Sequence, residues 1–238
     1  MKHVVRNFTV DIVRTIAILM MVVFHFIYDL RTFAYHDWDI PDGPGWKQWR
    51  ESIVSLFLLC VGVSLVFSHS NSIRWKKFGL RFISILGAAI LISIVTFYSY
   101  PENWIYFGIL HFIANASLLS LPLVNMPRLA VLAATGLLLA TYFDLVNTRW
   151  PYYAFFPGLP WHPHDFVPLV PWLALVWIGI ALGHSEWLRR DPLSGFPYRS
   201  QLVKPGQHSL AIYLLHQPVI IALMAITAYL FGMGSTPF

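Results

Sequence analysis

Four ionisable side chains lie on one face of the first strongly apolar segment, residues 8–30. They are Asp11, Arg14, His25 and Asp29. At about 100° of rotation per residue, the four fall within roughly 60° of one another on a helix. A charge that faces lipid at the centre of a membrane costs about 2.5–3.5 kcal/mol, so we expect these groups to face other helices or a water-filled cavity. The stripe indicates a polar path through the protein, with chemistry along it.

His25 and Asp29 are four residues apart and share a helix face. A carboxylate beside an imidazole fixes the tautomer of the ring and raises its basicity, which suits a general base. The alternative interpretation is a buried polar pair that joins two helices. His111 is a second candidate base at a comparable depth, with Asn115 one turn further along. Its alternative is a histidine satisfied by an amide or hydroxyl across a helix interface.

The last apolar segment begins with polar residues that could bind an anion. Free amides and the helix dipole attract anions to a helix N-terminus, where Gln207 and His208 stand. Ser209, Tyr213 and His216 share a face that runs inward from there. Together with Asp11 and Arg14, they are the candidate residues for binding a phosphate or thioester. The alternative is an ordinary helix with a capped start and a kink at a proline.

No metal site is predicted from the sequence. His162 and His164 lie in one loop of the chain, but His-x-His in a loop is a weak metal signal.

Composition indicates a membrane protein that crosses the bilayer several times. The chain has 238 residues, of which 57% are hydrophobic and 11% charged, and its mean hydropathy is +0.62. Soluble domains have about 25% charged residues. The net charge of +5 comes from basic residues in the loops between apolar runs, which argues against a nucleic-acid partner. The single cysteine, Cys60, excludes an intramolecular disulfide.

Seven apolar segments are long enough to span a bilayer, so we expect an all-α fold of about seven transmembrane helices in one domain, 1–238. The expected segments are 8–30, 51–70, 78–98, 104–124, 128–146, 167–185 and 207–232. Alternate loops differ in their content of Lys and Arg, and the richer set includes the N-terminal residues. The positive-inside rule therefore predicts a cytoplasmic N-terminus and an extracytoplasmic C-terminus.

The chain also resembles the bacterial relatives of heparan-alpha-glucosaminide N-acetyltransferase, a family within the transmembrane acyltransferases. The resemblance extends over nearly the whole chain, and the order and spacing of its motifs are more specific than any one of them. It is carried by Asp11–Ala17, Met20–His25, Tyr28–Leu30, Leu56–Ser64, Tyr106–Phe112, Pro168–Gly183 and Gly206–Pro218.

The resemblance implies a multi-pass enzyme of the bacterial inner membrane. Such an enzyme takes an acyl group, expected to be acetyl, from cytosolic acetyl-CoA or another acyl-CoA. It delivers the group to a sugar amine or hydroxyl of a glycan-like acceptor beyond the membrane. The resemblance places the catalytic histidine of the family at His36. The family is glycine-rich between helix and histidine, whereas this chain has Tyr28-Asp29-Leu30, so either His25 or His36 is the base. A homo-oligomer is compatible with this interpretation.

Two other functions use the same intramembrane residues. A haem or quinone protein would employ His25, His111 and His216 as ligands from different helices. A small proton-coupled transporter would use the polar stripe as a relay, although no inverted repeat is evident.

Overall fold

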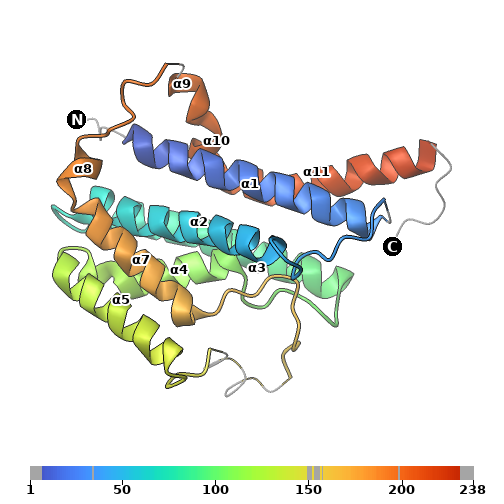
Figure 1. Cartoon of the computed structure of the whole chain (residues 1–238), viewed down its shortest axis with the longest axis horizontal. Coiled ribbons are helices and arrows are strands. Elements are labelled where there is room, and N and C mark those ends of the chain that lie inside the picture. Colours follow the sequence, from blue (N-terminus) through green and yellow to red (C-terminus); the bar gives the residue numbers. More distant parts are fainter. Residues whose placement is uncertain are drawn as a thin grey trace. The chain divides into compact units, whose positions relative to one another are not determined.

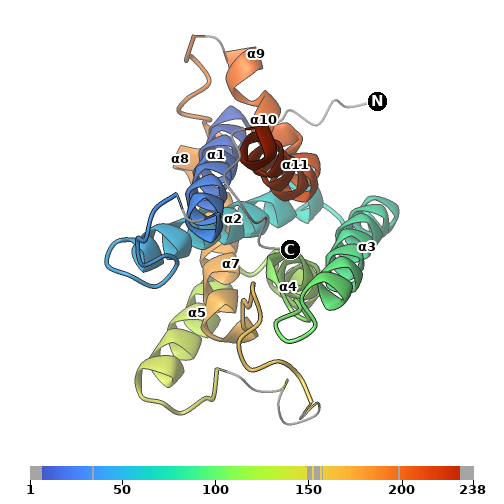
Figure 2. The same ribbon diagram turned by 90° about the vertical axis from the view of Figure 1, so that its right-hand side faces the viewer.

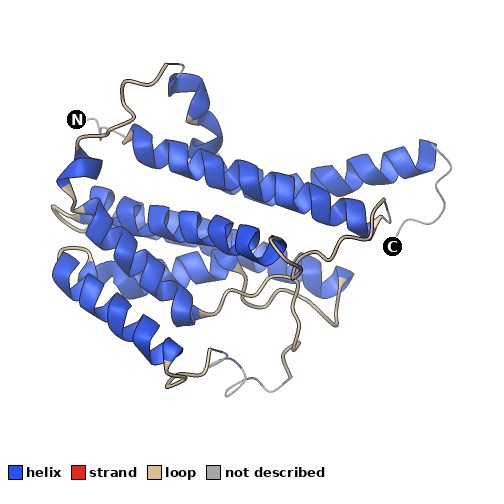
Figure 3. Ribbon diagram, in the orientation of Figure 1, coloured by secondary structure: helices blue, strands red, loops and turns tan. Residues whose placement is uncertain are grey.

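The computed structural model describes residues 7–33, 35–148, 152, 156, 158–197 and 199–230. These residues form helices and loops, and no strand occurs among them (Figure 3). The chain divides into two compact units, 1–57 with 191–238, and 58–190, and the boundary falls within helix α2. The single domain expected from the sequence stays a prediction.

The first unit combines the two ends of the chain. It contains α1 (Phe8–Thr32), the first half of α2 (Trp46–His69), two short helices, α9 (Arg199–Leu202) and α10 (Lys204–Gln207), and α11 (Ser209–Leu230). Helices α1 and α11 lie side by side and run in the same direction in both views (Figures 1 and 2).

The apolar core of the first unit is built on one face of α1. Ile18, Met21 and Phe24 of α1 are buried there with Ile40 and Ile53. Partly buried side chains complete the packing, among them Trp46, Trp49, Ile212 and Tyr213. Ile18 and Met21 lie on the same side of α1 as the polar stripe, so this inward face carries both the apolar core and the ionisable groups.

The second unit contains the second half of α2, α3 (Trp75–Ser99), α4 (Ile109–Ser120) with the short helix η1 (Leu121–Leu123), α5 (Pro127–Tyr142), α7 (Leu169–Gly183) and α8 (Glu186–Arg189). Helix α7 packs against α5 and α4, and α4 packs against α3.

Glycines bring α2 and α7 of the second unit into backbone contact. A Cβ atom on Gly62 would lie 2.7 Å from the Ile180 nitrogen, and one on Gly183 would lie 2.9 Å from the Val66 side chain. Gly179 and Gly183 are spaced as in the small-xxx-small pattern, which lets helices approach closely in membranes. This close crossing joins α2 to α7 within the second unit.

Each of the seven expected segments contains a helix, but only some of these helices have spanning length. Helices α1, α2, α3 and α11 are long and apolar enough to cross a membrane, whereas residues 109–123, 127–142 and 169–183 form shorter apolar helices. The chain is therefore a helical membrane protein. The count of seven spans and the orientation stay predictions.

The shorter helices begin later or end earlier than the hydrophobic pattern predicted, for local reasons. Helix α4 starts at Ile109 because Gly108 is extended and the Asp165 carboxylate accepts a hydrogen bond from the Ile109 N–H at 3.0 Å. Helix α7 starts after Pro168, and Val170 within its first turn is non-helical, since a residue before proline avoids the helical region.

Candidate functional site

A buried carboxylate near the N-terminal end of α1 accepts two hydrogen bonds. Asp11 is 6% exposed, and it accepts from Arg14 Nη1 at 3.0 Å and from Gln207 Nε2 at 3.3 Å. We call these three residues the Asp11 cluster. Because Asp11 offsets the charge of Arg14, the cluster presents a weaker cation to an anionic ligand than Arg14 alone would.

Helix α10 approaches α1 next to this cluster, at a distance that glycine permits. The Gly206 N–H donates to Thr15 Oγ1 at 2.9 Å, and the Thr15 hydroxyl donates to the Leu202 carbonyl at 2.8 Å. A Cβ atom on Gly206 would lie 2.8 Å from Thr15 Oγ1 and against the Asp11 carbonyl oxygen. The close contact places Gln207 beside Asp11.

The N-terminus of α1 is capped by a carboxylate that is distant in sequence. The Asp191 side chain accepts from the Phe8 N–H, the Thr9 N–H and the Thr9 hydroxyl at 2.7–2.8 Å. The Asn7 side chain accepts from the Val10 N–H at 3.0 Å. The amides that would attract an anion at this helix end therefore already have acceptors.

The five residues predicted to bind the cofactor from the last segment do not form one wall. Helix α11 begins at Ser209, so Gln207 ends α10 and exposed His208 stands between the two helices. The ring of Tyr213, one turn into α11, lies 5.8 Å from that of His216. The break after α10 thus divides the set into a group near Asp11 and a group further along α1.

Four polar residues meet near the C-terminal end of α1, and we call them the histidine cluster: His25, Asp29, His216 and Gln217. Asp29 is 3% exposed, and its two carboxylate oxygens accept from Gln217 Nε2 at 2.9 and 2.8 Å. The rings of His25 and His216 meet edge to face, with their centroids 4.8 Å apart. The cluster joins α1 to α11 within the first unit.

The structure does not pair His25 with Asp29 as expected, because each residue has another partner. His25 Nδ1 lies 2.9 Å from the Met21 carbonyl oxygen, while Asp29 pairs with Gln217. A carbonyl oxygen only accepts, so Nδ1 of His25 carries a proton, and in the neutral ring Nε2 holds the lone pair. The backbone of α1, rather than the carboxylate, fixes the tautomer.

His216 has the same tautomer as His25 for the same reason. Its Nδ1 lies 2.7 Å from the Tyr213 carbonyl oxygen and therefore donates. Its Nε2 is buried and has no hydrogen-bond partner in the part of the chain that the structure describes, and neither has Gln217 Oε1. Two neighbouring residues of α11 thus present buried acceptor atoms within the histidine cluster.

His36 lies in the loop after α1, where both ring nitrogens have backbone partners. Nε2 donates to the Ile27 carbonyl at 3.0 Å, and Nδ1 accepts from the Trp38 N–H at 3.2 Å. The ring also lies against Trp38, with centroids 4.4 Å apart, and Trp38 stacks in turn on Trp46. His36 must release one of these hydrogen bonds before it can act as a base.

His111 belongs to the second unit, where it stabilises the start of α4. Its Nε2 lies 3.2 Å from Ser93 Oγ, and its Nδ1 accepts from the Gly108 N–H at 3.3 Å. Ser93 donates its own proton to the Ile105 carbonyl, so it accepts from His111. Both nitrogens are used in local structure, which is the alternative that the sequence left open for this residue.

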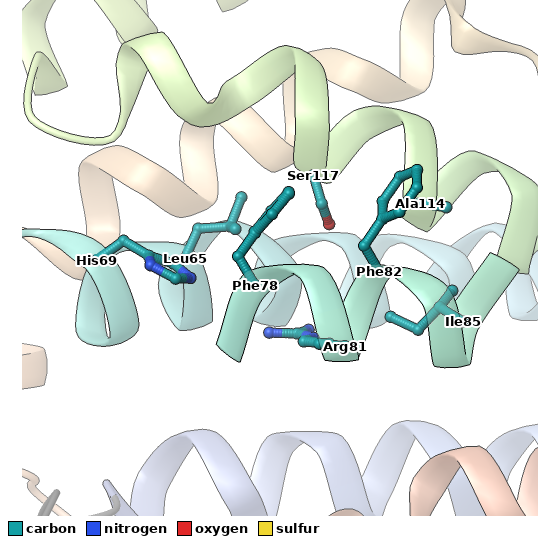
Figure 4. Close-up of a pocket in the computed structure, with 8 residues that line it drawn as sticks. All are labelled: Leu65, His69, Phe78, Arg81, Phe82, Ile85, Ala114 and Ser117. Carbon is teal, nitrogen blue, oxygen red and sulfur yellow. The ribbon is translucent and has the colours of Figure 1, made fainter. Parts of the chain in front are cut away.

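A small hollow in the second unit is lined by residues of α2, α3 and α4 (Figure 4). Its volume of about 10 Å³ has room for about one water molecule. Buried His69 and Ser117, together with Arg81, supply the polar atoms of its wall. The hollow is too small for an acyl-CoA group. Among the described residues, no group of three or more His, Cys, Asp or Glu is arranged to hold a metal ion.

Four residues that shape the site were not predicted from the sequence as site residues: Gln217, Asp191, Thr15 and Gly206. One signal was available for Gln217: in a seven-span topology, the first and last helices run in the same direction, so their polar residues can pair. Asp191 and Thr15 act across more than 180 residues of sequence, and no local pattern indicates such contacts.

The fold and the histidine cluster define a helical membrane protein with buried acid–base groups between two of its helices. The model of the family described as heparan-alpha-glucosaminide N-acetyltransferase, catalytic, matches residues 6–218. The chain belongs to this family, which comprises transmembrane acetyltransferases that use acetyl-CoA as donor. The match extends across both units. No curated protein and no solved structure matches the chain.

Proposed function

We propose that this protein transfers an acetyl group from cytosolic acetyl-CoA to a sugar amine or hydroxyl on the other side of a bacterial inner membrane. The observation that carries the proposal is the family match over residues 6–218. Seven helices with a cytoplasmic N-terminus would place the Asp11 cluster near the donor and the histidine cluster near the acceptor. The family match favours acyl transfer over the haem and transporter alternatives.

His25 is the general base in this proposal. Its tautomer leaves Nε2 with a lone pair, as a base requires, whereas both nitrogens of His36 have backbone partners. His36 lies close to α1, since its Nε2 donates a hydrogen bond to the Ile27 carbonyl. The resemblance to the family implies that His36 is the base, and this role would require its loop to release one of these hydrogen bonds.

Acetyl-CoA would bind at the end of α1 that carries the Asp11 cluster. The N-terminal amides of α1 are already capped by Asp191, so the candidate groups for binding the CoA phosphates are Arg14, exposed Lys204 and exposed His208. Arg14 is partly accessible, with 20% of its side chain exposed.

Isothermal titration of acetyl-CoA into the detergent-purified protein tests the donor site. We expect micromolar binding that is weakened at least several-fold by Arg14→Ala and by His208→Ala. Arg50→Ala is the matched control, because Arg50 pairs with Asp42 at 3.2 Å and follows Trp49, whose ring lies against Phe24 in the C-terminal half of α1. Absence of binding to the unaltered chain, or equal affinity in all three variants, would contradict the proposal.

A further inference from the structure

The histidine cluster has more buried hydrogen-bond acceptors than donors. Gln217 Nε2 donates to both oxygens of Asp29, and both imidazole Nδ1 protons are used by backbone carbonyls. His216 Nε2 and Gln217 Oε1 remain buried without a partner among the described residues. Buried polar atoms are normally satisfied, so unpaired acceptors on two neighbouring residues of α11 point to a ligand that brings donors.

The orientation of the Gln217 amide follows from Asp29. A carboxylate only accepts, so it must face the nitrogen of the amide, and the oxygen is then directed away from Asp29. Asp29 thus acts as a positioning residue, and Gln217 Oε1 is held as an acceptor. The pairing of Asp29 on α1 with the amide nitrogen of Gln217 therefore leaves the amide oxygen on α11 as an unpaired hydrogen-bond acceptor.

We propose that His216 and Gln217 form the half of the active site that binds the acetyl acceptor, the sugar amine or hydroxyl. His216 is then a catalytic residue that shares the role of base with His25. This inference rests on the proposed acetyl transfer. The N–H or O–H groups of the acetyl acceptor donate hydrogen bonds to His216 Nε2 and to Gln217 Oε1. The contact between the two imidazole rings places both basic nitrogens within one cluster.

The reaction balances with these groups alone. The nitrogen or oxygen of the acceptor forms a bond to the acetyl carbon, and the carbon–sulfur bond of the thioester breaks, so CoA leaves as a thiolate. The proton lost by the acceptor moves to Nε2 of His216 or His25. The imidazolium then retains its hydrogen bond to a helix carbonyl through Nδ1.

His216→Asn is the informative variant, because its side-chain amide can still donate to the Tyr213 carbonyl while Nε2 is lost. With glucosamine as the acceptor probe and full-length protein in detergent, we expect kcat to fall about 100-fold or more. Acetyl-CoA affinity and unfolding temperature should remain as in the unaltered chain. The matched control is His162→Asn in an exposed loop, which should retain full activity.

A purely structural role for His216 predicts other results. In His216→Ala, added imidazole should restore part of the activity if the ring supplies a base, and should not if the ring only packs. A His216→Asn variant with kcat within twofold of the unaltered chain would overturn the inference. Absence of acetyl transfer by the unaltered chain would instead refute the proposed function, and this inference with it.

Discussion

Gly206→Ala should destabilise the first unit, although alanine is normally the better residue in a helix. The added Cβ would press against Thr15 Oγ1 and the Asp11 carbonyl oxygen. Overpacking of this kind costs about 1–3 kcal/mol. The shift would also break two hydrogen bonds through the Thr15 hydroxyl, each contributing about 1 kcal/mol.

The net effect follows from adding these contributions and subtracting the gain in helix propensity, which is at most about 1 kcal/mol. We expect a loss of about 2–4 kcal/mol in the free energy of unfolding. A chain of this size changes its unfolding temperature by about 2–4 °C for each kcal/mol, so the temperature should fall by about 5–15 °C.

Thermal unfolding in detergent, followed by tryptophan fluorescence, measures this change. Gly195→Ala is the matched control, because it lies in the same unit and a Cβ there meets nothing within 4 Å. Its unfolding temperature should stay close to that of the unaltered chain. Equal unfolding temperatures for Gly206→Ala and Gly195→Ala would refute the close approach of α10 to α1.

Two further predictions concern contacts that fix each unit. Asp191→Ala should lower the free energy of unfolding by about 1–2 kcal/mol, because the amides of Phe8 and its neighbour lose their cap; an unchanged unfolding temperature would argue against that cap. Gly62→Ala should cost about 1–3 kcal/mol through overpacking against α7, whereas Gly87→Ala, which meets nothing within 4 Å, should be neutral or slightly stabilising. Thermal unfolding compares the two glycine variants, and the same result for both would contradict the helix crossing.

The helices of this chain could be predicted from the sequence because hydrophobic runs are local signals. The polar stripe of α1 was predicted for the same reason: spacing alone puts Asp11 and Asp29 on one face, and both are buried. Helix ends were less predictable. Gly108 and Asp165 together set the start of α4, and Asp165 lies more than 50 residues further along the chain.

The partners within the candidate site could not be read from spacing. His25 and Asp29 are on one face, yet Asp29 pairs with Gln217 because α11 lies beside α1. The helix of His25 supplies the Met21 carbonyl, which competes for the imidazole proton. His216 was grouped with the cofactor-binding residues because it shares a helix face with Ser209 and Tyr213, and only the packing of α11 places it beside His25.

Acetyl transfer across a sealed bilayer tests the central claim most directly. Proteoliposomes that contain the full chain would receive radiolabelled acetyl-CoA outside and carry glucosamine inside. The proposed function predicts labelled acetylglucosamine within the vesicles, and its loss in His25→Ala while acetyl-CoA binding remains. No labelled product inside vesicles that contain folded protein would contradict transfer across the membrane.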